Sequence, residues 1–120
     1  MAEHIIRIID VVGSDLCIAS DDGEKLYARI ADAIRRGEKV QLSFAGIQDL
    51  TSAFLNSAVG QLYSGEFSEP QLKASLLPPL DTSPDDLALL KRVVERAKQY
   101  FKDRDRFHRA EKEVLGDDQE

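Results

Sequence analysis

Short apolar runs along the chain predict four strands. Residues 5–12 are rich in β-branched side chains, which favour a strand. A Gly-Ser-Asp turn at residues 13–15 leads into the apolar residues 16–19, which we expect to pair back as the second strand of an antiparallel hairpin. Polar and apolar residues alternate over 39–44 and predict a third strand, and residues 72–77 are the fourth candidate.

Apolar residues at helical spacing predict two helices between these strands. The first opens at residues 20–23, continues to Ile34 and stops at Gly37. The second is expected from about Thr51 to Tyr63. Its apolar stripe comprises Leu55, Ala58, Val59 and Leu62.

A third helix has the clearest start in the chain. Ser83 is placed to cap it, Pro84 takes the first helical position, and two acidic residues follow. Beyond Lys102 the sequence becomes highly charged, with a thinner apolar stripe of Phe107, Ala110 and Val114. We therefore expect a domain over residues 1–102, followed over residues 103–120 by a charged helical extension and a disordered tail.

The order of these elements predicts a small α/β domain. Each strand–helix–strand step implies a parallel crossover, whereas the opening hairpin is antiparallel. The expected architecture is a mixed sheet of four to five strands with helices mainly on one face.

Composition and charge narrow the classes of function. The 120 residues fit one domain, and their net charge of −6 argues against binding to nucleic acid or to an anionic membrane surface. No apolar run is long enough to span a membrane, and the N-terminus has no signal-peptide pattern. With a single cysteine, Cys17, the chain is expected to be a reduced, cytoplasmic protein.

Enzymatic motifs are absent from the sequence. There is no glycine-rich phosphate loop, and the two histidines, His4 and His108, lie near opposite ends of the chain. Cys17 lies in an apolar run, which is typical of a buried structural thiol. We expect no catalytic residues, no metal and no cofactor.

One segment, residues 40–62, has features that suit a regulated surface. A strand leads through a loop containing Gly46 into a helix headed by Thr51 and Ser52. The free amides and the dipole of a helix start favour negative charge, so a phosphate there would be tolerated and would change binding to a partner. The simpler interpretation is that Thr51 caps the helix and Ser52 fills its first turn.

Several separated segments resemble a bacterial STAS-like domain of unknown function. The resemblance covers roughly residues 5–102. It rests on Asp22-Gly23-Glu24-Lys25-Leu26, on Val40-Gln41-Leu42-Ser43-Phe44-Ala45-Gly46-Ile47, on Leu50-Thr51-Ser52-Ala53-Phe54-Leu55-Asn56 and on Gly60-Gln61-Leu62-Tyr63. The helix that starts at Ser83 also suits that family.

The resemblance implies a regulatory interaction. STAS domains include the anti-sigma factor antagonists, in which a serine at a helix start is phosphorylated by a histidine-kinase-like ATPase, and phosphorylation releases that partner. By this analogy Ser52 takes the place of the phosphorylated serine, and Thr51 takes the place of the aspartate before it. We therefore expect a non-enzymatic module with Ser52, then Thr51, as phosphorylation candidates.

The predicted interaction site comprises the loop and the helix start. We expect Leu55 to lie in the core and Phe54 to be an exposed contact. The site residues are Gly46, Asp49, Thr51, Ser52, Phe54 and Asn56.

Two alternatives stay open. In one, a small molecule, a nucleotide or another anion binds at the same helix start, in a pocket at the carboxyl ends of the strands. Its lining would comprise Ser43, Asp49, Thr51, Ser52 and Asn56. In the other, the charged helix beyond Lys102 pairs with a second copy of the chain to form a homodimer, although a solvated helix is the simpler interpretation.

Overall fold

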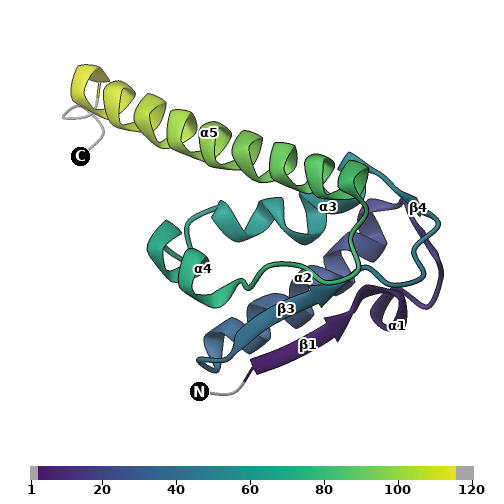
Figure 1. The fold of residues 1–120 in the computed structure, drawn as a ribbon. Helices are drawn as coiled ribbons and strands as arrows, with labels where there is room; N and C mark the ends of the chain where they lie inside the picture. The colour runs from purple at the N-terminus through teal and green to yellow at the C-terminus, as the bar shows by residue number, and fades with distance from the viewer. Residues whose placement is uncertain (1–2, 116–120) are drawn as a thin grey trace.

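A computed structural model describes the backbone of residues 3–115 and the side chains of residues 3–103 (Figure 1). The strands are β1 (Glu3–Arg7), β2 (Leu16–Cys17), β3 (Lys39–Ser43) and β4 (Asp49–Leu50). The helices are α1 (Ile8–Val12), α2 (Ser20–Arg35), α3 (Ser52–Ala58), the 3-10 helix η1 (Gly60–Tyr63), α4 (Glu69–Ser75) and α5 (Pro84–Leu115).

The strands form two separate parallel pairs, so the predicted sheet of four to five strands is wrong. β1 pairs with β3, and β2 pairs with β4. The extended chain after α4 adds to the first pair: the Leu77 N–H donates to the Val40 carbonyl at 2.8 Å, and the Leu80 N–H donates to the Leu42 carbonyl at 2.8 Å. β3 therefore lies between β1 and this extended segment.

The predicted antiparallel hairpin is also wrong. The chain leaves the strand conformation after Arg7 and turns into the single-turn helix α1. Gly13 ends α1 with φ of 79°, and its N–H donates to the Ile9 carbonyl at 2.8 Å. Ile8 is fully buried at the start of α1. Burial against the rest of the fold thus outweighs the β propensity of these branched side chains.

Residues 72–77 do not begin as a strand either. Residues 72–75 complete α4, and only Leu76 and Leu77, at the end of the predicted strand, pair with β3. The start of α4 is fixed by Ser68, whose hydroxyl accepts a hydrogen bond from the Gln71 N–H at 3.1 Å. Pro70 lies in the first turn, where its missing N–H costs nothing, and Leu72 is buried. Ser68 and Pro70 are a helix-start signal in the sequence, but the apolar run over residues 72–77 favoured a strand instead.

The other predicted elements are confirmed with small changes. The helix after residue 20, the strand over residues 39–43 and the helix after Ser83 all form, and Ser83 accepts the Asp86 N–H at 3.1 Å. The helix expected to run from Thr51 to Tyr63 is divided into α3 and η1.

α5 continues without a break past Lys102, so the backbone after this residue begins as a helix, and α5 extends away from the other helices (Figure 1). The side chains of Phe107, Ala110 and Val114 and the tail after Leu115 lie outside the described residues.

The core lies on one face of the β1–β3 pair. Ile6, Val40 and Leu42 are buried on that face, under the helices. The opposite face carries Ile5, which is 58% exposed. Because side chains of a strand alternate between faces, the five residues of β1 are divided between the core and solvent.

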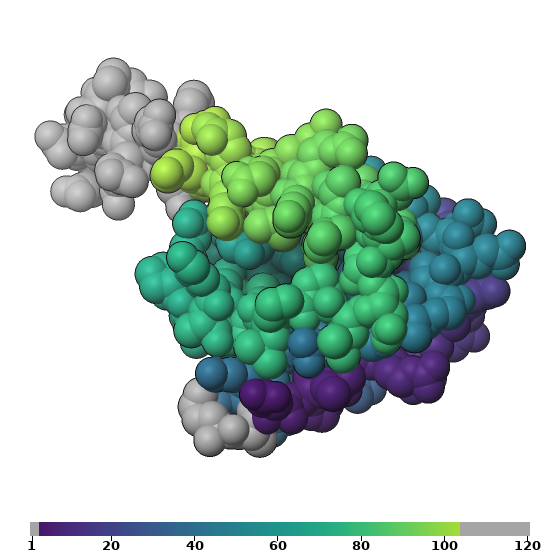
Figure 2. All heavy atoms as spheres, in the orientation of Figure 1, coloured from purple at the N-terminus to yellow at the C-terminus, as the bar shows by residue number. Residues whose placement is uncertain are grey.

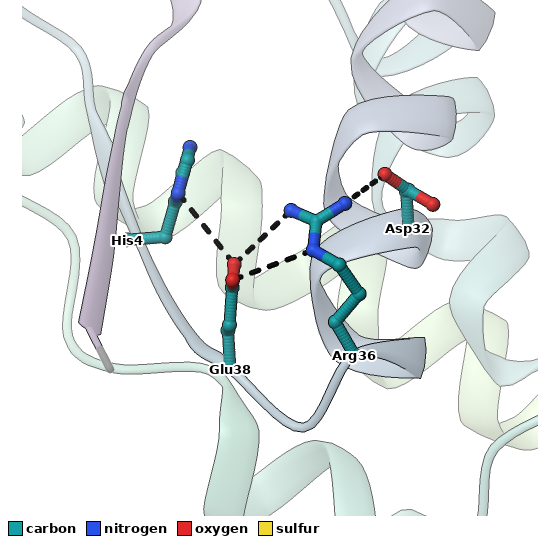
Figure 3. A network of polar contacts seen from close by, with 4 residues as sticks. All are labelled: His4, Asp32, Arg36 and Glu38. Atoms are coloured by element: carbon teal, nitrogen blue, oxygen red, sulfur yellow. Dashed lines mark hydrogen bonds and ion pairs between the residues drawn. The ribbon is translucent and has the colours of Figure 1, made fainter. Parts of the chain in front are cut away.

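A polar network fixes the end of α2 to both strands of this pair (Figure 3). Arg36 contacts Asp32 one turn earlier and donates to Glu38 at 3.1 and 3.3 Å, and His4 lies 3.6 Å from Glu38. The hydrogen bonds from Arg36 hold the pKa of the Glu38 carboxyl below its usual range.

α2 and α3 approach each other most closely at Gly23. A Cβ atom at this position would lie 2.5 Å from the Phe54 carbonyl oxygen and 2.7 Å from the Ser57 Cβ. Only glycine fits this contact, because the nearest atom belongs to the backbone and has no room to move. The position of α3, and of the Thr51–Ser52 start, therefore depends on Gly23.

We predict that Gly23→Ala destabilises the protein by about 1 to 3 kcal/mol through steric overlap. At a solvent-exposed helix position the same substitution would raise the free energy of unfolding by about 1 kcal/mol. Whether this free energy rises or falls therefore distinguishes a close contact from an exposed position. Chemical denaturation measures it, with the exposed neighbour Glu24→Ala as control. A more stable Gly23→Ala protein would contradict the close contact.

Candidate functional site

The candidate site lies where two strand–helix units run side by side. β2 leads into α2, β4 leads into α3, and the two strands are parallel. The starts of both helices therefore follow the same end of one strand pair. The Thr51 N–H donates to the Cys17 carbonyl at 3.2 Å and continues the pairing up to the start of α3.

The Thr51 hydroxyl has two structural partners. It accepts the Phe54 N–H at 3.2 Å, which caps α3, and it donates to the Ile18 carbonyl at 2.8 Å. The hydroxyl thus fastens the start of α3 to the chain that follows β2. The capping role predicted for Thr51 is confirmed, and its oxygen is committed to this role.

Ser52 differs from Thr51 in being open to solvent. It is the first residue of α3 and is exposed, and its hydroxyl makes no hydrogen bond within the described residues. Of the two predicted phosphorylation candidates, Ser52 is the one that a partner protein can reach without breaking a structural contact.

The expectation that Phe54 is an exposed contact is wrong. Its side chain is 0% exposed and lies in the core together with Leu55. α3 is covered on the side of α2 by the approach at Gly23, and α5 packs against another side. Its buried face is therefore wider than the single stripe of apolar residues indicated.

The remaining predicted site residues are spread over a larger area. Asp49 is exposed on β4, opposite Leu16 in the strand register. Gly46 is exposed in the preceding turn, close to α1, where a Cβ would lie 3.2 Å from Ile9 Cδ1. Asn56 is exposed on α3 and borders a hollow toward α5, lined also by Arg96 and Tyr100. Asp49, Thr51 and Ser52 follow one another at the junction of β4 and α3. Gly46 lies before this junction, near α1, and Asn56 lies after it, toward α5.

Two apolar residues that the sequence analysis did not select belong to this surface. Leu16 is 43% exposed and Ile18 is 45% exposed, and they flank the fully buried Cys17. Ile18 is joined to the site directly, because its carbonyl accepts the Thr51 hydroxyl. The alternation of exposed, buried and exposed residues has the period of a strand, but three apolar residues in a row did not reveal which of them face solvent.

Cys17 is inert in this setting. Burial, together with the nearby Asp22 and Asp15 carboxylates, raises the pKa of its thiol to about 11. The thiolate is the reactive form, so the thiol is structural, as the sequence predicted.

The residues predicted to line a ligand pocket at this helix start do not all lie together in the structure. Ser43 lies on the other strand pair, is buried, and donates to the Asp81 carboxylate at 3.3 Å. Thr51 and Ser52 follow β4 instead. Because the strands do not form one sheet, their carboxyl ends do not share one crevice.

A cavity of 520 Å³ lies elsewhere, between β3, η1, the segment after α4, and α5. Figure 2 shows the hollow beneath α5. Its lining is almost entirely apolar, with Lys91 and Glu95 at the α5 side. The apolar lining residues are Val40, Leu42, Val59, Leu76, Leu77, Pro79, Leu87, Leu90 and Val94.

The described part of the chain contains no group of three or more His, Cys, Asp or Glu side chains placed to hold a metal ion. In the same part, no helix combines the length and the apolar character needed to cross a membrane.

Comparison with known families identifies one family over the central part of the chain. Residues 22–83 match the family described as the STAS-like domain of unknown function (DUF4325). The chain belongs to this family. Neither a curated protein nor a solved structure matches it. The STAS-like segment extends from the first turn of α2 to the cap of α5, so it includes both Gly23 and the Thr51–Ser52 start.

We predict that Thr51→Ala lowers the free energy of unfolding by about 1 to 2 kcal/mol, because it removes the cap and the hydrogen bond to Ile18. Thr51→Ser keeps the oxygen and should recover most of the loss. Ser52→Ala should change stability little. Urea denaturation of the three variants measures this, and equal effects of Thr51→Ala and Ser52→Ala would contradict the structural role of Thr51.

Proposed function

We propose that this STAS-like chain is a non-enzymatic regulatory module that binds a histidine-kinase-like ATPase and is switched by phosphorylation of Ser52. The observation that supports the proposal is the setting of Ser52, an exposed residue that follows Thr51 at a helix start fastened by hydrogen bonds to the Ile18 carbonyl and the Phe54 N–H. The partner is the one implied by the resemblance to anti-sigma factor antagonists.

The surface around Ser52 favours a protein partner over a small ligand. Leu16 and Ile18 offer exposed apolar area along the strand pair that leads to the serine: Leu16 is opposite Asp49, and the Ile18 carbonyl accepts the hydroxyl of Thr51, the residue before Ser52. Exposed apolar groups beside a polar rim are typical of interaction sites. The rim is acidic: Asp15, Asp21 and Asp49 are exposed on the same strand–helix units. A partner face with an apolar centre and basic edges would complement it.

Phosphorylation would act on this surface through charge. The Ser52 oxygen would attack the γ-phosphorus of ATP held by the partner, lose its proton and leave ADP. The product adds close to two negative charges to a surface that is already acidic. α3 is short and already capped by Thr51, so the main effect falls on the partner and favours its release.

A binding experiment with four variants tests the proposal. The ATPase that co-purifies with the chain from its native cells is purified, and its affinity is measured by calorimetry. Ser52→Ala should bind as the unchanged protein does. Ser52→Asp and Ile18→Asp should each bind at least tenfold more weakly, and Ala74→Asp, an exposed change on α4, should have no effect.

The same preparation, incubated with ATP, should add one phosphate to the protein but none to Ser52→Ala, as read by mass spectrometry. If no ATPase co-purifies, or if Ser52→Asp and Ser52→Ala bind equally well, the proposal is wrong.

The cavity under α5 supports a second candidate function, binding of a small uncharged apolar molecule. Its volume is within the range of about 300 to 1,000 Å³ that is typical of ligand pockets. The backbone groups at its floor are already paired, since Leu77 and Leu80 bond to β3. A ligand there would need apolar surface and few polar atoms.

Titration with the neutral dye N-phenyl-1-naphthylamine tests this second candidate. We expect saturable fluorescence enhancement that Leu90→Trp weakens at least tenfold by filling the cavity. Ala88→Trp adds the same ring to the exposed side of α5 and should leave binding unchanged. Equal binding by both variants would place the dye elsewhere and overturn the candidate.

A further inference from the structure

The outer edge of β1 carries no strand within the described part of the chain. β3 occupies one edge of β1, and no described strand pairs with the other (Figure 1). Ile5, at the centre of β1, is 58% exposed. An open edge with an apolar residue at its centre is a template for a further strand.

The hydrogen-bond pattern of β3 shows which residues of β1 have backbone groups free for pairing. Val40 and Leu42 use their carbonyl groups toward the segment after α4. Gln41, between them, therefore turns its backbone groups toward β1, where it is in register with Ile5.

In a parallel ladder, a residue bonds to the two neighbours of the residue opposite it, which here are His4 and Ile6. Glu3, Ile5 and Arg7 consequently direct their backbone N–H groups toward the open edge. The side chains of these three residues also share the solvent face of the strand pair, and all three are exposed.

The charges along this edge are complementary to themselves. Two β1 strands can pair in antiparallel orientation with Ile5 at the centre. The residue two positions before Ile5 then lies opposite the residue two positions after it, so Glu3 faces the partner's Arg7 and Arg7 faces the partner's Glu3. Ile5 faces the partner's Ile5 at the two-fold axis. Opposite charges and apolar residues facing each other across strands are stabilising arrangements.

Competing contacts on this edge are weak. Arg7 lies 3.8 Å from Asp10, but both side chains are more than half exposed, and such pairs contribute little. His4 is turned to Glu38 on the other face and does not interfere (Figure 3).

We propose that two copies of this chain associate through their β1 edges, in antiparallel orientation, with Ile5 against the partner's Ile5 and two Glu3–Arg7 ion pairs. The β1–β3 pair of one copy and the β1–β3 pair of the other become one continuous sheet across the two-fold axis. The five-residue strand gives a small contact, so the dimer forms reversibly at high protein concentration. This inference does not depend on the proposed role of Ser52.

Charge reversal gives a sharp test, because the two ion pairs join different residues. Sedimentation velocity of the full chain from micromolar to millimolar concentration should show the mass rising from 13.4 kDa toward twice that value. Glu3→Arg and Arg7→Glu should each weaken the dimer about tenfold or more, because they place like charges opposite each other. The double variant Glu3→Arg/Arg7→Glu should restore it.

A mixture of the two single variants tests directly whether Glu3 and Arg7 face each other across the interface. Glu3→Arg carries only positive charges at these positions and Arg7→Glu only negative ones, so the mixture should form a heterodimer more tightly than either variant associates with itself. Circular dichroism verifies that each variant folds. A protein that stays monomeric at millimolar concentration, or a dimer that neither reversal weakens, would overturn the proposal; the second result would favour a contact through α5 instead.

Discussion

The contact of α2 with α3 at Gly23 is the constraint on which the rest of the structure depends. The missing side chain lets the Phe54 carbonyl approach the α2 backbone more closely than any Cβ would allow. Phe54 and Leu55 are thereby enclosed, and α3 becomes a core element although it has only seven residues. A helix this short has little stability of its own, so its position comes from packing.

From this contact the organisation of the surface follows. α3 is fixed at its start by the Thr51 hydroxyl, which joins the helix cap to the Ile18 carbonyl. Cys17 is buried between Leu16 and Ile18 in the sequence, and those two side chains are exposed on the segment that Thr51 joins to α3. The exposed serine therefore stands at a helix start that two hydrogen bonds of Thr51 hold in place.

The two strand pairs give the molecule two separate exposed regions. One is the acidic and apolar surface around Ser52 on the β2–β4 pair. The other is the solvent face and open edge of β1, where Glu3, Ile5 and Arg7 lie. One continuous sheet would have joined these regions; two short pairs keep them apart, so binding at one need not block the other.

The sequence by itself determined the elements with strong local signals. The Ser83 cap, the helical spacing of α2 and α5, the alternation in β3 and the capping role of Thr51 are readable from neighbouring residues, and the STAS-like family is readable from several separated segments. Only the tertiary structure decided the helical state of Ile8–Val12, the parallel pairing of β2 with β4, the burial of Phe54 and the exposure of Leu16 and Ile18. The physical reason is that apolar residues carry the same local signal whether they face solvent or the core, and only contacts between distant segments select their side.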